Sequence, residues 1–272
     1  MVLSEANTPE QTAKIVWDEP LIDHTSAGTT GRVLSLIDYD NVVWIDTLNG
    51  FSGTTYPIGT RGYKVNNALD AASIAGKQNI QTFNITGELI SQRPISNVTI
   101  GGRSWINDSL ILQGYHYNSV IIENLYLSGN LNASDILFER CYLNDINEME
   151  GEVIDSRISG TIYVASGKTF SGVGIVVEGD AIIDLQGQPC TVSLDVDSGY
   201  ITFINSVAGC LIEIGLGGGE IELDPSCTGG DFYIQGDGTL YGDPIALGMN
   251  LIGNNLLGLN PIADYVWEKT LP

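Results

Sequence analysis

Apolar and polar residues recur every sixteen positions between Trp105 and Ile175. Written at that spacing, the chain reads WINDSLI, IIENLYL, LFERCYL, VIDSRIS and TFSGVGI. The second position of every unit is apolar and the third is polar, as in Ile106 and Asn107. The second positions are Ile106, Ile122, Phe138, Ile154 and Phe170, and the third positions are Asn107, Glu123, Glu139, Asp155 and Ser171. Because successive side chains of a strand point to opposite faces, this pattern predicts one core-facing and one solvent-facing column.

A fixed period of this length, with no helical segment between the units, is typical of a solenoid. We therefore predict an all-β fold, a right-handed parallel β-helix with 16-residue rungs in its middle. Successive rungs would stack at ~4.8 Å, so the apolar column would be buried. An antiparallel sandwich also has regularly spaced strands and is the alternative. It does not require residue type to persist at a constant offset, so the β-helix is favoured.

The sequence divides into three predicted regions. Residues 1–40 form an N-terminal attachment and trimerisation segment with a short helix, which is too short to be stable alone and so needs a partner. Residues 41–245 form the β-helix domain. Within it, residues 66–75 have a helical apolar pattern, and we predict a short helix that closes the open end of the solenoid. Residues 246–272 form an extended C-terminal tail.

Beyond Ile175 the strand pattern continues without the sixteen-residue spacing. The expected strands are separated by glycine-rich turns and span residues 181–185, 191–196, 200–204, 211–214, 220–223 and 231–234. Further rungs of altered length and capping hairpins both fit this pattern. The apolar, turn-rich tail that follows suits winding around sister chains, so a homotrimer is expected.

The two ends of the chain share a short motif. Residues 13–21 align with residues 263–271 at one constant offset, and both contain a Val-Trp pair, an acidic residue and a leucine. The matched apolar residues are Val16, Trp17 and Leu21 in the first copy and Val266, Trp267 and Leu271 in the second. We predict that both copies dock onto a partner.

Charge and cysteine content narrow the function. Thirty-three acidic residues against eleven basic ones give a net charge of −22, which argues against binding nucleic acid or an anionic membrane surface. No stretch is apolar enough for membrane insertion, and no signal peptide begins at Met1, so synthesis in a cytoplasm is expected. The four cysteines show no zinc-site spacing and are expected to be reduced packing residues. No metal or cofactor is predicted.

Two sets of side chains are candidates for chemistry. The column of Glu123, Glu139 and Asp155 could bind a cation or cleave polysaccharide, since paired carboxylates serve glycoside hydrolases. Solvent-facing positions of a rung are usually polar for no further reason, and we favour that interpretation, so no catalytic residue is predicted. Tyr115, His116 and Tyr117 are candidates for a surface contact. Tyr126 and Tyr142 are expected in the core or at a subunit interface.

Three segments together resemble structural proteins of tailed bacteriophages. Residues 13–31 are similar to the segment A-x-x-V-W-D/E-x-x-L-x-x-H-T-x-x-G-x-x-G of those proteins. Residues 43–50 and 223–230 look like the start and a late turn of their β-helical domain. The resemblance implies a trimeric, elongated virion component that is attached at one end. The attachment or trimer-joining residues it implies are Val16, Trp17, Leu21, His24, Thr25 and Gly28. The second copy departs from the pattern, because it stops before any His-Thr.

The expected function is that of a non-enzymatic structural virion protein. It would be a homotrimeric β-helical tail or baseplate fibre or spike, assembled in the host cytoplasm, that binds other virion proteins and a host-surface glycan or protein. A head fibre or capsid decoration protein and a tailspike-like polysaccharide depolymerase are the alternatives. A bacterial adhesin is disfavoured by the missing signal peptide.

Overall fold

A computed structural model describes residues 39–252, which belong to two compact units divided between Gln81 and Thr82. The predicted N-terminal attachment helix lies outside the described residues, as does most of the C-terminal tail. The predicted docking residues Val16, Trp17, Leu21, His24, Thr25, Gly28, Val266, Trp267 and Leu271 also lie outside them. Their roles therefore stay predictions.

The first unit contains strand β1 (Val43–Asp46) and helix α3 (Ala68–Gln78). The helix begins after Asn67, whose side chain accepts a hydrogen bond of 2.8 Å from the backbone N–H of Asp70, and it ends at Asn79 in the left-handed conformation. A helix is present close to residues 66–75, as predicted, with both ends shifted towards the C-terminus. Its role in closing the solenoid stays a prediction. Ala71, Ile74 and Ala75 are buried, and Leu69 is exposed.

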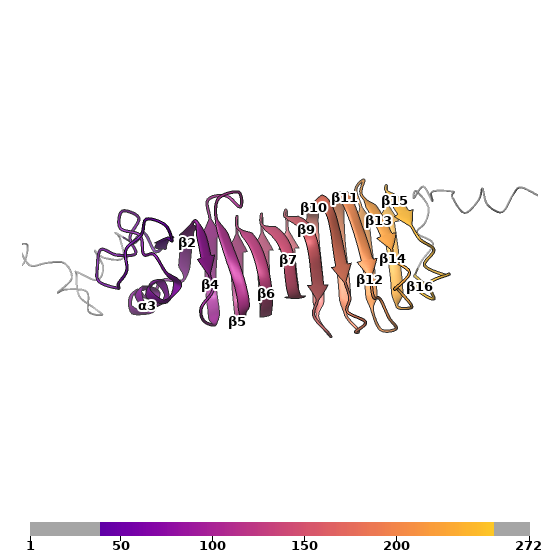
Figure 1. The fold of residues 1–272 in the computed structure, drawn as a ribbon, viewed down its shortest axis with the longest axis horizontal. Helices are drawn as coiled ribbons and strands as arrows, with labels where there is room; N and C mark the ends of the chain where they lie inside the picture. Colours follow the sequence, from indigo (N-terminus) through magenta and orange to yellow (C-terminus); the bar gives the residue numbers. More distant parts are fainter. Residues whose placement is uncertain (1–38, 253–272) are drawn as a thin grey trace, which may run out of the picture. The chain divides into compact units, whose positions relative to one another are not determined.

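The second unit is a parallel β-solenoid of about eight turns, with its strands stacked side by side (Figure 1). The strands of its first half are β2 (Thr82–Thr86), β3 (Glu88–Ile90), β4 (Ile95–Gly102), β5 (Ser109–Glu123), β6 (Tyr126–Glu139), β7 (Tyr142–Met149), β8 (Gly151–Ile154) and β9 (Arg157–Val164). Those of its second half are β10 (Thr169–Asp184), β11 (Thr191–Ile204), β12 (Leu211–Leu216), β13 (Glu220–Leu223), β14 (Asp231–Gly236), β15 (Thr239–Tyr241) and β16 (Asn250–Leu251). The parallel solenoid is thus confirmed and the antiparallel sandwich is wrong.

The rungs are not uniform, and a constant sixteen-residue rung is not confirmed. Ile122 pairs with Phe138 at that spacing, but Phe138 pairs with Val153 rather than Ile154. Side chains of a strand alternate with a period of two, so this shift of one residue buries Val153 and moves Ile154 out of the core. Ile106 also leaves the predicted column, because it lies in a turn with 72% of its surface exposed.

Rungs in the second half of the solenoid are about twenty residues long. Thr191 pairs with Leu211, and Leu211 pairs with Asp231, a spacing of twenty residues. Tyr200 likewise pairs with Glu220. The strands after Ile175 are therefore further rungs and not capping hairpins. The sixteen-residue pattern does not extend into this half, where the spacing is twenty.

One corner of the solenoid is built by a column of residues in the left-handed conformation. Asn124, Arg140, Asp155 and Gly174 have φ angles of 55°, 53°, 47° and 67°. The backbone N–H of each non-glycine member donates to a carbonyl of the next rung, as from Asn124 to Glu139 at 3.1 Å and from Arg140 to Ile154 at 3.0 Å. The turn is thus repeated from rung to rung, and it places the candidate acidic residues at the outer edge.

The shifted pairing of β8 can be tested with two matched substitutions. Val153→Asp buries an unpaired carboxylate, so we expect the free energy of unfolding to fall by about 3 kcal/mol or more. Ile154→Asp lies outside the core, and we expect a loss of about 1 kcal/mol or less. Urea denaturation followed by circular dichroism measures both. An equal or larger loss for Ile154→Asp would contradict the shifted pairing.

A second pair of substitutions tests the close stacking of rungs. Gly129 has a φ of +104°, and a Cβ there would lie 2.3 Å from the carbonyl oxygen of Leu112 in the rung before it. Gly179 also has positive φ, +78°, but a Cβ would meet nothing within 4 Å. We expect Gly129→Ala to cost about 2–4 kcal/mol and Gly179→Ala about 1 kcal/mol. Similar losses in thermal or urea denaturation would show that backbone conformation alone, and not stacking distance, sets the cost.

Candidate functional site

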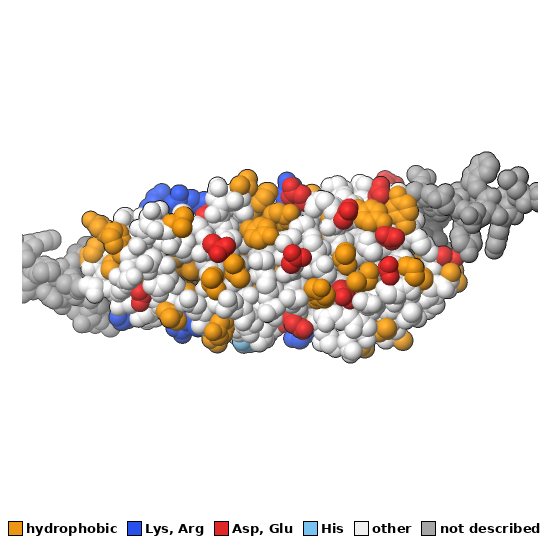
Figure 2. Space-filling view, in the orientation of Figure 1, with side chains coloured by type: hydrophobic (Ala, Val, Ile, Leu, Met, Phe, Trp, Pro, Cys, Tyr) orange, Lys and Arg blue, Asp and Glu red, His pale blue; other side chains and the backbone are white. Residues whose placement is uncertain are grey.

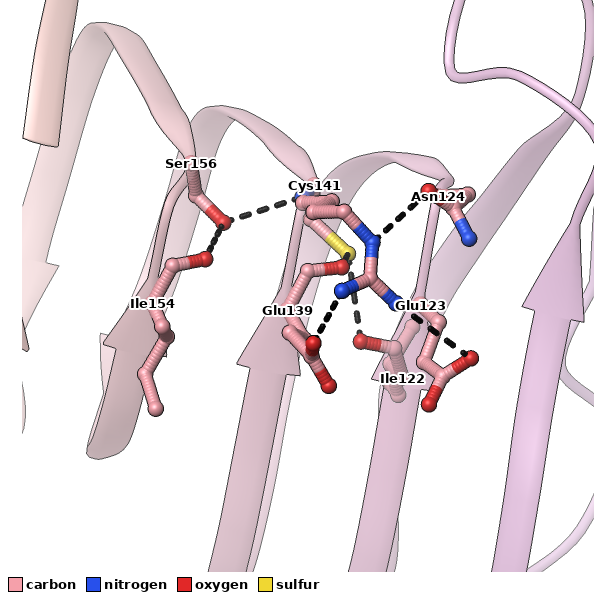
Figure 3. Close-up of polar contacts among 8 residues, drawn as sticks. Ile122, Glu123, Asn124, Glu139, Cys141, Ile154 and Ser156 are labelled. Carbon is pink, nitrogen blue, oxygen red and sulfur yellow. Dashed lines mark hydrogen bonds and ion pairs between the residues drawn. The ribbon is translucent and has the colours of Figure 1, made fainter. Parts of the chain in front are cut away.

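The acidic column contains two neighbouring carboxylates with the guanidinium of Arg140 beside them. Glu123 and Glu139 are directly paired on β5 and β6, and Asp155 is displaced into the corner turn. Arg140 forms an ion pair with Glu139, and its Nη2 lies 3.9 Å from Oε2 of Glu123. Its Nε also donates to Oδ1 of Asn124 at 3.3 Å. Figure 3 shows both carboxylates at this corner.

The interior of the same corner is closed by hydrogen bonds. The backbone N–H of Cys141 donates to Oγ of Ser156 at 2.9 Å, and that hydroxyl donates to the carbonyl of Ile154 at 2.7 Å (Figure 3). The Cys141 thiol donates to the carbonyl of Ile122. Burial raises the pKa of the Cys141 thiol to about 12, so it stays protonated and is a poor nucleophile. This corner is therefore a structural joint.

Two general features of the described chain concern metals and membranes. Within residues 39–252, no group of three or more histidine, cysteine or acidic side chains is placed to hold a metal ion. Over the same range, no helix is both long enough and apolar enough to cross a bilayer.

The predicted contact residues Tyr115, His116 and Tyr117 lie on β5, and the structure separates them. Tyr115 and His116 are exposed, whereas Tyr117 is fully buried. The expectation that all three share a surface is therefore corrected for Tyr117. In a regular strand Tyr115 and Tyr117 would share a face. β5 is interrupted here, because Gly114 has a φ of 73° and the pairing with β6 shifts between Gln113 and His116. The two tyrosines therefore face different sides.

His116 belongs to a polar stripe, which we define as His116, Asn118, Asn132 and Ser134 on β5 and β6. Nδ1 of His116 lies 3.2 Å from Oδ1 of Asn132, and Nε2 of His116 lies 3.4 Å from Oγ of Ser134. Ser134 donates to Oδ1 of Asn118 at 2.9 Å. These contacts link amide, hydroxyl and imidazole groups on adjacent rungs. The stripe thus presents both donors and acceptors to solvent.

An open groove of about 530 Å³ lies next to the stripe, at a corner of the rungs. Ser119 and Asp135 form the corner, both with positive φ, and the Ser119 hydroxyl donates to the Asp135 carboxylate at 2.8 Å. The remaining lining contributes a second carboxylate, two hydroxyls and an apolar floor. It comprises Val120, Ile121, Ile136, Leu137, Gly151, Glu152, Thr169 and Ser171.

The short strand β8 explains where the groove lies. It has four residues between the much longer β6 and β10, and it begins at Gly151. A Cβ at Gly151 would lie 2.5 Å from the carbonyl of Ile136, so only glycine allows this approach of the rungs. Sequence reasoning missed the groove because it assigned this rung the wrong pairing. The glycine at 151 was the available signal.

The groove and the stripe together suit a polyhydroxylated ligand. Amide, hydroxyl and carboxylate groups match sugar hydroxyls as donors and acceptors. The side chains of Ile121 and Leu137 supply apolar surface for the C–H face of a sugar ring. We define the binding surface as the polar stripe plus this groove.

Comparison with known proteins finds no significant match. No family model, no curated protein and no solved structure is similar to this chain.

A separate aromatic cluster lies on another part of the outer surface. Tyr142 makes edge-on contacts with Trp105 and Tyr126, at ring-centroid distances of 5.2 and 5.3 Å, and the Arg157 guanidinium lies 5.3 Å from the Trp105 ring centroid. Apolar side chains gather over β6 and β7 in Figure 2, where acidic side chains are spread over the same face. Tyr126 and Tyr142 are half-buried, so they are not core residues. Their role at a subunit interface stays a prediction.

The separation of Tyr115 from Tyr117 leads to a stability test. We expect Tyr117→Ala to lower the free energy of unfolding by about 3–5 kcal/mol, because it empties a large buried volume. Tyr115→Ala removes an exposed ring and should change stability by about 0.5 kcal/mol or less. Chemical denaturation of the two variants checks this. Equal losses would mean that Tyr115 also packs into the fold.

Proposed function

We propose that the chain is a non-enzymatic structural protein of a tailed-phage virion, a homotrimeric β-helical tail or baseplate fibre or spike that binds glycans on the host surface. The observation that carries the glycan-binding role is the continuous outer surface made by the polar stripe and the groove. The virion assignment is supported by the motif in residues 13–31, which resembles a segment of phage structural proteins. A parallel solenoid suits such a role because it displays one extended, rigid surface.

The size and chemistry of the groove favour a small glycan unit. A volume of about 530 Å³ falls in the range of small-molecule sites. Asp135 and Glu152 add negative charge to a chain whose net charge is −22. The resulting field repels polyanions, so the proposed ligand is a neutral or cationic glycan.

The acidic column supports binding without cleavage. Hydrolysis of a glycosidic bond needs one carboxylic acid that donates a proton and a second carboxylate that acts as base or nucleophile. Arg140 forms an ion pair with Glu139, and its Nη2 lies 3.9 Å from Oε2 of Glu123, so a guanidinium is the group placed beside both carboxylates. The pair is thus engaged in holding a side chain of the fold itself, which disfavours the depolymerase alternative.

A matched pair of glutamates tests the glycan-binding role. Glu152, Ser171, Ser193 and Glu213 form one outward column on successive rungs, and only the first two lie in the groove. We expect Glu152→Ala to weaken binding of the full chain to immobilised neutral glycans about tenfold or more, because a charged hydrogen bond is lost. Glu213→Ala should bind as the unmodified chain does. Biolayer interferometry over a panel of bacterial surface glycans provides the measurement. Absence of binding to the whole panel, or equal effects of both substitutions, would refute the site.

The virion role is tested by immunogold electron microscopy of particles from the cells that make the protein. Antibody against residues 100–245 should place gold on the tail or baseplate. Gold over the head would support the head-fibre or capsid-decoration alternative instead. Particles without gold would refute a virion role. Sedimentation of the full chain as a monomer would refute the trimer.

A further inference from the structure

We propose that Cys190 and Cys210 form a disulfide that joins two successive rungs when the protein meets a hydroperoxide oxidant. This inference is independent of the proposed function, because it rests only on the stacking of β11 and β12. All four cysteines of the described chain are free thiols in the structure. Only these two lie at matched positions on neighbouring rungs.

The geometry of the pair comes from the strand pairing. Cys190 and Cys210 immediately precede β11 and β12, whose first residues Thr191 and Leu211 are paired. The backbone N–H of Leu211 donates to the carbonyl of Cys190 at 2.9 Å, which fixes the two segments side by side. Neighbouring strands are ~4.8 Å apart, and disulfides span Cα separations of about 4.4–6.8 Å. A disulfide therefore fits between the rungs without a large backbone movement.

The two cysteines are buried side by side. They are 4% and 1% exposed, and the Cys210 thiol donates to the carbonyl of Gln188 at 3.2 Å. Interaction between the two thiols lowers the pKa of Cys210 and raises the pKa of Cys190. Burial raises the pKa of the Cys141 and Cys227 thiols. Because the thiolate is the nucleophile, Cys210 is the thiol that reacts first.

The reaction proceeds in two balanced steps. The Cys210 thiolate attacks one oxygen of hydrogen peroxide, so an S–O bond forms, the O–O bond breaks and the departing hydroxide takes up the thiol proton as water. The Cys190 sulfur then attacks the sulfenic acid of Cys210. The S–S bond forms, the S–O bond breaks, and the second oxygen leaves as water with the proton of Cys190. The two thiols lose two electrons, which the peroxide accepts.

The oxidant must be small, because the burial of both sulfurs excludes bulky disulfides such as oxidised glutathione. The disulfide would close a loop of about twenty residues and remove conformational freedom from the unfolded chain. Unfolding of the C-terminal rungs should therefore become more difficult after oxidation.

The test uses the full chain, fully reduced and then freed of reductant, with hydrogen peroxide as the oxidant. We expect two of the four thiols to disappear, the intact mass to fall by two hydrogens, and a peptide map to show Cys190 linked to Cys210. The Tm should rise on oxidation and return to its starting value with dithiothreitol. Four thiols still titratable after treatment, or a link that uses Cys141 or Cys227, would overturn the proposal.

Two single variants separate the roles of the thiols. Cys190→Ser should stop the reaction at the sulfenic acid of Cys210, which dimedone traps, and Cys141→Ser should form the disulfide as the unmodified chain does. Dimedone labelling at a cysteine other than Cys210 would contradict the order of reaction. If a variant does not fold, the peptide map of the unmodified chain still decides whether the link forms.

Discussion

Parallel pairing of the backbone from rung to rung is the constraint on which the rest of the structure depends. Each rung of the second unit satisfies its backbone donors and acceptors with the rungs before and after it, as from Tyr142 to Leu125 and from Arg157 to Cys141. The environment of a residue is thus decided by the residues it pairs with on the adjacent rungs, which are about fifteen to twenty-two residues away in the sequence. The same constraint places Phe138 against Val153 and Cys190 beside Cys210.

Local pattern was enough to predict the class of fold. Alternation of apolar and polar residues indicated strands, and the repeat indicated stacking in parallel. Ile122, Phe138 and Phe170 are buried as the pattern predicts. Helix α3 was also recognisable, because its apolar residues have helical spacing over a short segment.

The pairing itself could not be read from the pattern. Val153 and Ile154 are both β-branched and apolar, so nothing in their chemistry shows which one enters the core. The choice depends on the short connection between β7 and β8, which makes β8 begin at Gly151. If the pairing of β8 is assigned one residue away, the groove is not recognised. Glu152 lies beside Ser171 in the groove lining only when β8 has its observed partners. Ile106 shows a related limit, because a turn can interrupt a column that the repeat would continue.

Strand pairing also decides how the solenoid would respond to a pulling force. The backbone hydrogen bonds between rungs run along the stacking axis, so tension along that axis would load them directly. An interface between rungs then resists in proportion to the number of paired residues it contains. β14 and β16 pair through two residues, whereas β5 and β6 pair over most of their length. Under load, separation within the described solenoid would therefore begin at its last rung, where β16 lies against β14.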